Sequence, residues 1–134
     1  MAKAELKTKQ TESSVEEFLN AIADEKVLED SKKIIEMMSK ATGAKPKMWG
    51  ASIIGFGSRL LKYDSGRELD WMEIGFSPRR ANLTLYLSLG GGWNEALMAD
   101  LGNHKLGKGC LYIKRLRDID ENVLKKIIEG SVEK

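Results

Sequence analysis

The segment from residue 82 to residue 89 alternates strictly between leucines and polar side chains. The leucines are Leu83, Leu85, Leu87 and Leu89, and the residues between them are Thr84, Tyr86 and Ser88. Successive side chains of a β-strand point to opposite faces, so this period of two predicts a strand with one buried face. Such a strand is typical of an antiparallel sheet that is covered on one side. The segment therefore constrains the fold to helices packed on a sheet.

The residues before this strand predict two antiparallel neighbours for it. Segments 52–63 and 69–76 are rich in β-branched, aromatic and glycine residues, and the Asp-Ser-Gly sequence between them is typical of a tight turn. Gly55 and Gly57 inside the first segment indicate a bulge or the close approach of another backbone. A second turn leads into the alternating strand. We therefore expect a three-stranded antiparallel meander.

Apolar residues at helical spacing predict two helices before the sheet. The first is marked by residues at positions i, i+3, i+4 and i+7, which are Val15, Phe18, Leu19 and Ile22. Its N-cap candidates are Thr11, Ser13 and Ser14. The second helix runs from Val27 to Ala41, and Gly43 supplies a left-handed C-cap. Because the link between the helices is short, we expect an antiparallel pair that covers the sheet.

The C-terminal third of the chain predicts a helix, a fourth strand and a last helix. A short helix follows the three glycines at 90–92 and ends at Gly102, residues 110–113 form the strand, and Asp118 or Asp120 caps the final helix. The predicted order is ααβββαβα. We therefore expect an α+β fold with its helices on one face of the sheet, as a single domain over residues 1–134 with a core at about 14–130.

Length, composition and charge exclude several classes of protein. The chain has 134 residues, of which 42% are hydrophobic, and 22 basic against 20 acidic side chains give a net charge of +2. This length suits one domain, and no apolar run approaches the roughly 18–20 residues of a membrane span. A single cysteine, Cys110, and a single histidine, His104, exclude an internal disulfide and a Cys/His zinc site. Since the first residues lack an apolar signal core, we expect a cytosolic bacterial-type protein.

Several motifs in a fixed order resemble the YdhG-like family of bacterial proteins. They are PKMWG at 46–50, IGFG at 54–57, GFSPR at 75–79, NLTLY at 82–86, and GKGCLYI at 107–113 followed by Leu116 and Asp-Ile-Asp at 118–120. The resemblance covers roughly residues 14–130. It implies a compact α+β fold similar in outline to frataxin, in a family most of whose members have no established activity. One relative is regarded as a frataxin-like iron chaperone, so iron delivery is an implied function.

Two glycine-rich turns predict a site for a small anion. The turn at 75–80 and the loop at 102–109 combine backbone freedom with positive charge, and neither matches a P-loop or a dinucleotide fingerprint. Arginine and lysine supply the charge that a phosphate or carboxylate requires. The cationic candidates are Arg79, Arg80, Lys105 and Lys108, and the candidate hydroxyl partners are Tyr86 and Tyr112. The alternative is that the glycines serve only the turns and the lysines only solubility.

Aromatic residues predict a second kind of surface. Trp49, Phe56 and Trp71 lie in or beside the predicted sheet, and a sheet face without helices could use such rings to bind a ligand or partner. The alternative is that they form cross-strand pairs that stabilise the sheet. Arg59, Lys62 and Arg67 lie nearby, but the chain has no RNA-recognition motif. We therefore do not expect a nucleic acid as partner.

Uneven charge along the chain predicts an acidic surface on the first helices. Residues 11–30 hold seven acidic side chains and one basic, a net charge of −6, whereas residues 31–67 hold eight basic and two acidic, a net charge of +6. Carboxylates could bind weakly held iron, as the frataxin-like reading requires. The candidate ligands are Glu16, Glu17, Glu25 and Glu29. The alternative is a solvated acidic helix face.

The residues taken together favour binding over catalysis. Cys110 leads into an apolar strand, where a half-buried structural thiol is commoner than a nucleophile, even with His104 and Lys108 nearby. We therefore predict a non-enzymatic domain without a cofactor that binds a small anionic ligand or a protein partner and does not act at a membrane. The alternatives are a frataxin-like iron chaperone and an enzyme of unassigned class.

Overall fold

The protein folds into a layer of helices on an antiparallel sheet. The computed structural model describes residues 14–50, 52–62, 64–66, 68–79, 82–89, 92, 94–107 and 110–133. The helices are α1 (Val15–Asn20), α2 (Glu25–Thr42), α3 (Glu95–Leu101) and α4 (Glu121–Glu133), with a 3₁₀ turn at Leu116–Asp118. The strands are β1 (Pro46–Trp49), β2 (Ile53–Phe56), β3 (Arg59–Lys62), β4 (Glu68–Trp71), β5 (Ile74–Pro78), β6 (Leu83–Tyr86), β7 (Lys105–Gly107) and β8 (Cys110–Ile113). The predicted α+β class is confirmed.

Six of these strands form one antiparallel sheet in the order β1-β2-β5-β6-β8-β7. The predicted meander is present, because β2 pairs with β5 and β5 with β6. The predicted fourth strand is β8, which pairs with β6. Two edge strands were not expected from the sequence. They are β1, which begins with a proline, and β7, which lies within the predicted loop at 102–109.

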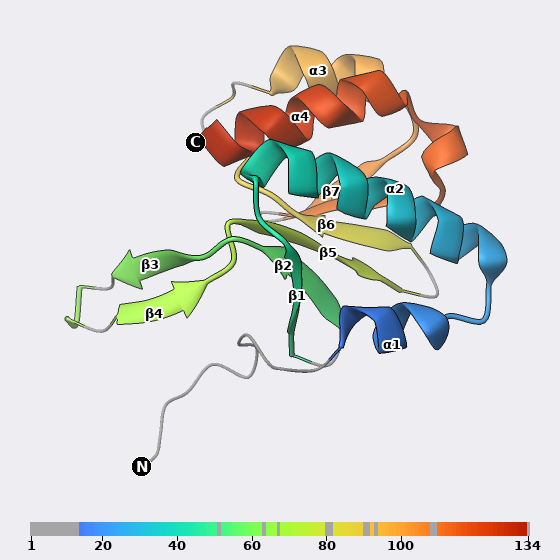
Figure 1. Ribbon diagram of the computed structural model, residues 1–134. Coiled ribbons are helices and arrows are strands. Elements are labelled where there is room, and N and C mark those ends of the chain that lie inside the picture. The colour runs from blue at the N-terminus through green and yellow to red at the C-terminus, as the bar shows by residue number, and fades with distance from the viewer. Residues whose placement is uncertain are drawn as a thin grey trace.

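The predicted strands at 52–63 and 69–76 are each divided in the structure. Gly57 has a φ of +68° and ends β2, and Met72 and Glu73 separate β4 from β5. The Glu73 amide donates to the Phe56 carbonyl across this junction at 3.1 Å. As a result β3 and β4 pair only with each other and project from the sheet as a separate hairpin (Figure 1). The predicted irregularity at the glycines is therefore a change of direction in both strands.

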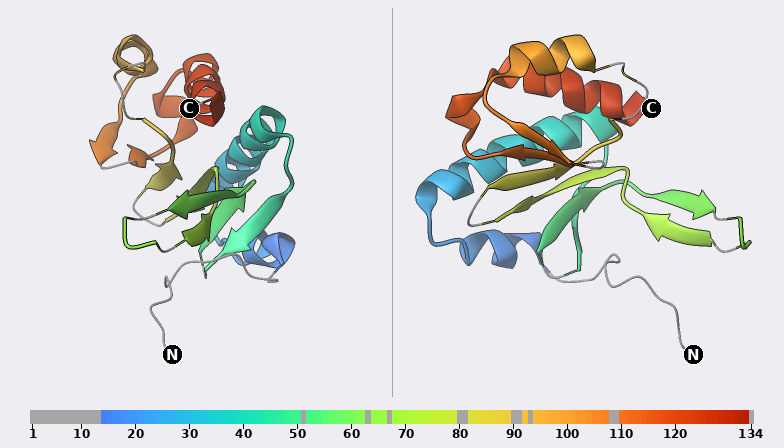
Figure 2. Two further views of the ribbon diagram at one scale, coloured as in Figure 1. Left: turned by 90° about the vertical axis from the view of Figure 1, so that its left-hand side faces the viewer. Right: turned by 180° about the vertical axis from the view of Figure 1, so that it is seen from behind.

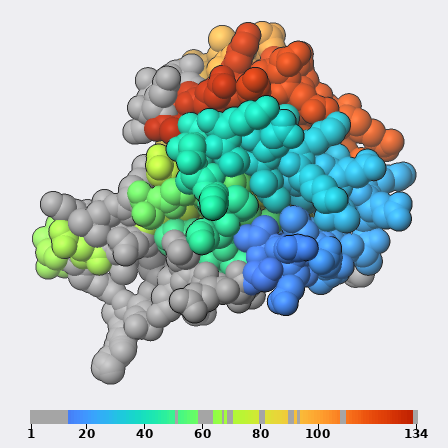
Figure 3. All heavy atoms as spheres, in the orientation of Figure 1, coloured from blue at the N-terminus to red at the C-terminus, as the bar shows by residue number. Residues whose placement is uncertain are grey.

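The helices of the described chain lie on one face of the sheet (Figure 2). On the visible side, α1, α2 and α4 form a continuous outer layer (Figure 3). The predicted antiparallel pairing of the first two helices is wrong. α2 packs against α4 and β5, whereas α1 packs against β1 and diverges from α2 beyond their link (Figure 1). The physical reason is that α1 has only six residues, so its apolar side is too short to match that of α2.

Capping residues set the helix limits. The Ser14 hydroxyl accepts from the Glu17 amide, and the Asp24 carboxylate accepts from the first amides of α2. Gly43 ends α2 with a φ of +72°, as predicted. Of the two predicted caps for the last helix, Asp120 fills the role, because its carboxylate accepts from the amides of Asn122 and Val123.

The core lies between the sheet and the helices. Its sheet side is built by alternate residues of β2, β5, β6 and β8, including the leucines of the alternating segment. Its helix side comes from α2, α3 and α4. The other residues of the same strands point to the uncovered face of the sheet. In the part of the chain that the structure describes, no helix is long and apolar enough to cross a membrane.

Candidate functional site

The uncovered face of the sheet divides into two halves of different chemistry. The second half lies over the end of β5 and over β6, β8 and β7. Strand alternation and register place mainly polar residues there. We call this set the polar half. Its members are Ser77, Arg79, Asn82, Thr84, Tyr86, Asn103, Lys105, Gly107, Cys110, Tyr112 and Lys114. None is acidic, whereas Arg79, Lys105 and Lys114 are cationic.

A small cavity lies at one end of the polar half. Its volume is about 110 Å³, and its lining residues are Asn82, Asn103, His104, Lys105, Tyr112 and Lys114. Lys105 stands directly opposite Tyr112 across the β7–β8 pair. The lining therefore combines two ammonium groups, an imidazole, two amides and a phenol with no carboxylate.

Two hydrogen bonds orient donors of the cavity lining. The Thr84 hydroxyl donates to Asn82 Oδ1 at 2.7 Å, which leaves the Asn82 Nδ2 donor for another partner. His104 Nδ1 lies 2.8 Å from the Gly102 carbonyl. Because a carbonyl only accepts, Nδ1 carries the hydrogen, and protonation of the ring would add an Nε2–H donor.

Two tyrosines belong to the polar half, Tyr112 in the cavity lining and Tyr86 on the neighbouring strand. Arg79 Nη2 donates to the Tyr86 hydroxyl at 2.9 Å, and Tyr86 stands opposite Cys110 on the neighbouring strand. The neighbouring Cys110 raises the pKa of Tyr112, through the charge of its thiolate and a hydrogen bond, and partial burial adds to this effect. Tyr112 therefore stays a neutral hydrogen-bond donor at ordinary pH.

A buried carboxylate fixes the chain just after the cavity. Asp30 on α2 is 5% exposed, and its Oδ2 accepts from Arg115 Nε at 2.7 Å and from the Leu116 amide at 3.1 Å. This hydrogen bond raises the pKa of the Arg115 guanidinium. Arg115 follows Lys114 directly, so the contact ties the end of β8 to the helix layer. The backbone next to Lys114 is thus held against α2 by this contact.

The structure brings together four of the six residues predicted for the anion site. These are Arg79, Tyr86, Lys105 and Tyr112. The other two, Arg80 and Lys108, lie outside the described residues. Sequence reasoning did not include Asn82, Asn103, His104 and Lys114 among the site residues, although they line the cavity. The signal for Lys114 was present, because it follows Tyr112 by two positions and so shares its face.

The predicted aromatic surface is largely buried. Phe56 belongs to the core beneath the helices and is 0% exposed, so its place on an open face is wrong. Trp49 does point to the uncovered face, but it is 1% exposed and makes a T-shaped contact with Trp71 at 5.9 Å between ring centroids. Trp71 is half-buried. The rings therefore pack on the sheet, in agreement with the structural alternative.

The candidate iron ligands stand on two separate helices. Glu16 and Glu17 lie on α1, and Glu25 and Glu29 lie on α2, all of them exposed. Among the described residues, no group of three or more His, Cys, Asp or Glu side chains could hold a metal ion. Iron binding by these carboxylates stays a prediction. Cys110 is half-buried, as predicted, and its structural role likewise stays a prediction.

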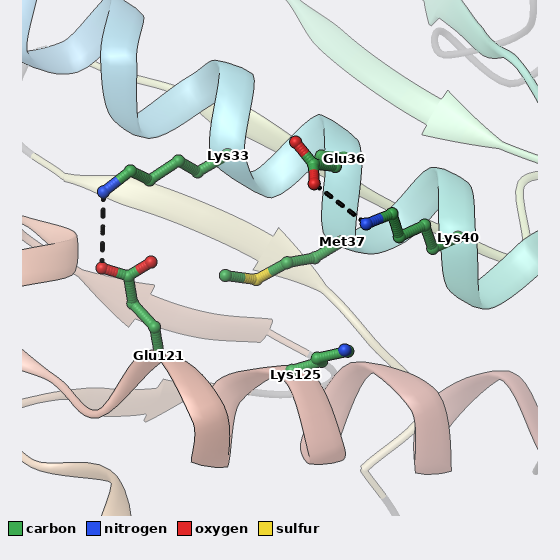
Figure 4. A pocket seen from close by; sticks show the side chains of 6 residues that line it. All are labelled: Lys33, Glu36, Met37, Lys40, Glu121 and Lys125. Atoms are coloured by element: carbon green, nitrogen blue, oxygen red, sulfur yellow. Dashed lines mark hydrogen bonds and ion pairs between the residues drawn. The ribbon is translucent and has the colours of Figure 1, made fainter.

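Two larger hollows carry less suitable chemistry for an anion. The groove between α2 and α4 has a volume of about 330 Å³, and Figure 4 shows both of its carboxylates paired with lysines, while Lys125 lies on α4. Lys33 Nζ lies 3.5 Å from Glu121, and Lys40 Nζ lies 3.0 Å from Glu36. A hollow of about 460 Å³ beside the α1–α2 link includes Asp24. Both hollows contain carboxylates, so the smaller cavity is the stronger candidate despite its size.

Comparison of the chain with models of protein families, with curated proteins and with solved structures found no match. The resemblance to the YdhG-like family, and the frataxin-like outline that it implies, therefore stay predictions.

Proposed function

We propose that the protein is a non-enzymatic binding module for a small anionic ligand, which it holds in the cavity beside Tyr112. The observation that carries this proposal is the charge of the polar half. Lys105 and Lys114 line the cavity, Arg79 stands beside the cavity residue Asn82, and no Asp or Glu occurs among the residues of that half. Uncompensated cations beside neutral donors are the arrangement that phosphate and carboxylate groups require.

The size of the cavity limits the bound group. Pockets for drug-sized molecules usually measure about 300–1,000 Å³, whereas this cavity measures about 110 Å³. It suits a single phosphate or carboxylate group. The amides of Asn82 and Asn103 and the hydroxyl of Tyr112 would bind the oxygens of that group, and the lysines would balance its charge.

Titration calorimetry with inorganic phosphate and with sulfate tests the proposal. We expect binding by the native chain that weakens as salt is added, because the lysines are solvent-exposed. The double variant Lys105→Gln, Lys114→Gln should lose at least about tenfold in affinity, since each charge-assisted hydrogen bond is worth about 1.5–3 kcal/mol.

A matched control removes the same charge elsewhere. Lys32 on α2 and Lys126 on α4 are exposed and lie outside the cavity. The variant Lys32→Gln, Lys126→Gln should bind phosphate as the native chain does. If both double variants weaken binding equally, the effect comes from net charge and not from the cavity, and the proposal fails. Absence of phosphate and sulfate binding by the native chain also overturns it.

A further inference from the structure

The register of the sheet places Arg79 beside the cavity of the proposed function. The Arg79 amide donates to the Asn82 carbonyl at 2.9 Å. Continued past the strand ends, the pairing of β6 with β8 puts Lys114 opposite Asn82, and the pairing of β7 with β8 puts Asn103 opposite Lys114. Arg79 therefore begins a row of four residues, and the other three line the cavity.

Arg79 also lies close enough to the cavity lining to act on it. The pKa of Tyr112 is raised mainly by Cys110, and the positive charge of Arg79 works against this rise. With neighbouring strands about 4.8 Å apart, the Cα atoms of Arg79 and Lys114 are about 10 Å apart. Both residues are exposed and have long side chains, so they can contact one group between them. Arg79 is thus a third cation of the same site, besides Lys105 and Lys114.

The guanidinium of Arg79 keeps most of its hydrogen-bonding capacity. Arg79 Nη2 donates to the Tyr86 hydroxyl at 2.9 Å, and a guanidinium has five N–H donors. Among the residues that the structure describes, Arg79 makes no ion pair with a carboxylate. Tyr86 accepts this hydrogen bond through its oxygen, so its own O–H can donate to a ligand. Arg79 can therefore bind an oxyanion without losing its contact with Tyr86.

The carboxylates near this site interact with other groups. Asp24 lines a separate hollow with Arg79, and its carboxylate caps α2 by accepting from the first amides of that helix. Asp118 lies in the 3₁₀ turn, and its charge acts on Arg115, whose pKa the hydrogen bond to Asp30 raises most. Neither Asp24 nor Asp118 lines the cavity. The positive charge at the cavity is therefore not balanced by these carboxylates.

This charge exceeds what a carboxylate group would balance. Arg79, Lys105 and Lys114 carry three positive charges, whereas a carboxylate carries one negative charge. The phosphate of a monoester carries two negative charges above its second pKa of about 6, and it presents three acceptor oxygens. Coulomb energy is proportional to the charge of the ligand, so each cation attracts a doubly charged group twice as strongly. Three cations around one cavity therefore favour a doubly charged group.

We infer that the cavity selects a doubly charged tetrahedral group, the phosphate of a monoester or free phosphate, over a carboxylate, and that Arg79 contributes to this selection. The inference rests on the proposed function, because it concerns the anion bound in the same cavity. Lys105 and Lys114 contact the oxygens of the phosphate in the cavity. Arg79 and the hydroxyl of Tyr86 contact them from the β5 side.

Titration calorimetry with a set of small anions tests the inference at about pH 8, where phosphate groups are doubly charged. Methyl phosphate represents the monoester and inorganic phosphate the free ion. Dimethyl phosphate is tetrahedral with one charge, and acetate is planar with one charge. We expect methyl phosphate to bind at least about tenfold more tightly than dimethyl phosphate or acetate. Because acetate is smaller than methyl phosphate, its weaker binding would not come from steric exclusion.

Variants of Arg79 test its part in the selection. Arg79→Gln should weaken the binding of methyl phosphate about tenfold and that of dimethyl phosphate only about threefold, because the Coulomb energy of a lost cation doubles with the charge of the ligand. Arg79→Lys keeps the charge and should keep most of the preference. Lys126→Gln is the matched control, since Lys126 is exposed on α4, in the helix layer on the other face of the sheet (Figure 2), and it should leave both affinities unchanged. Thermal midpoints of all variants show whether they fold.

The outcomes separate this inference from the proposed function. If phosphate binds and requires Lys105 and Lys114, but acetate and dimethyl phosphate bind as tightly, the selection is wrong and the proposed function stands. If Arg79→Gln weakens the binding of methyl phosphate no more than Lys126→Gln does, Arg79 is not part of the site. If none of the anions binds, both proposals fail. A preference between methyl phosphate and inorganic phosphate shows which of the two sources the cavity fits.

Discussion

The two halves of the uncovered sheet face differ in how far their own side chains shield them from water. In the first half, the Trp49 indole lies over Gly55, and the Met72 sulfur lies over both Gly55 and Gly75. Trp49 is 1% exposed and Met72 is 0% exposed, so this half is closed by its own side chains. In the polar half, Tyr86, Cys110 and Tyr112 are only half-buried. One half thus forms a second small core without helices, and the other stays accessible.

The comparison teaches where a binding site can arise on such a sheet. The paired glycines of β2 and β5 have no side chains, which lets a tryptophan and a methionine lie directly on the backbone and exclude water. The strands of the polar half carry Tyr86 and Tyr112 on the same face, and both side chains are only half-buried. The hydroxyl and thiol groups accessible on this face therefore lie on β6 and β8, next to the lysine of β7.

Removal of Trp49 should have the largest effect on the closed half. Trp49→Ala should lower the free energy of unfolding by about 3–5 kcal/mol, the usual cost of truncating a buried tryptophan. Urea denaturation followed by circular dichroism measures this. Trp49→Phe should cost much less, because the Trp49 Nε1 group is buried without a hydrogen-bond partner among the described residues and phenylalanine removes that group. A loss below about 1 kcal/mol for the alanine variant would contradict the conclusion that Trp49 closes this half of the face.

A methyl group on the floor of the closed half should have the next largest effect. A Cβ atom at Gly75 would lie 2.6 Å from the Met72 sulfur and 2.7 Å from the Ile54 carbonyl oxygen. Gly75→Ala should therefore lower the free energy of unfolding by about 1–3 kcal/mol, as overpacking does. The same denaturation measurement checks it. An unchanged stability would show that the strands separate easily at this point.

Loss of the cavity lysines should leave stability almost unchanged, in contrast to the closed half. Lys105 and Lys114 are exposed, so the double change to glutamine should alter the free energy of unfolding by no more than about 0.5 kcal/mol. Added phosphate should raise the melting temperature of the native chain and not that of the double variant, because a ligand of the folded state stabilises it. A large loss of stability without phosphate would show that the polar half also serves the fold.

The smallest expected effect concerns the titration of Tyr112. Its pKa lies above 10.0 mainly because of the charge of Cys110. Cys110→Ala should therefore lower the pKa of Tyr112 towards its ordinary value, which ultraviolet difference spectra of the phenolate measure.

The raised pKa of Tyr112 also determines how this residue changes the stability of the protein with pH. A raised pKa means that the folded state holds its proton more tightly than the unfolded state, so stability falls as the pH rises above 10.0. In Cys110→Ala this alkaline loss should be smaller. An unchanged Tyr112 titration would show that Cys110 does not act on it.

Local patterns in the sequence were sufficient for the parts of the fold that depend on neighbouring residues. The leucine alternation predicted β6 and its buried face, and the Gly43 cap predicted the end of α2. β1 and β7 were missed because a proline and two glycines look like turn signals when their pairing partners are unknown. Their strand character comes from pairing with β2 and β8, which no local pattern contains.

The candidate site was predictable to the same extent. Arg79, Tyr86, Lys105 and Tyr112 were proposed from residue type, but their shared face follows only from the register of β6 with β8 and of β8 with β7. The burial of Trp49 could not be predicted, since it depends on a contact between Gly55 and Gly75 on strands about twenty residues apart. The chemistry of each residue can be predicted from the sequence, whereas the register between strands far apart in the chain cannot.

The position of β7 at the edge of the sheet has a consequence for self-association. An edge strand with free amides and carbonyls invites pairing with another chain, and natural proteins limit this with short strands and outward lysines. β7 has only three residues and begins with Lys105. A charged side chain in a strand this short disfavours the pairing of a strand from another chain with that edge. Lys105, which is proposed to bind a small anion, thus also disfavours self-association through β7.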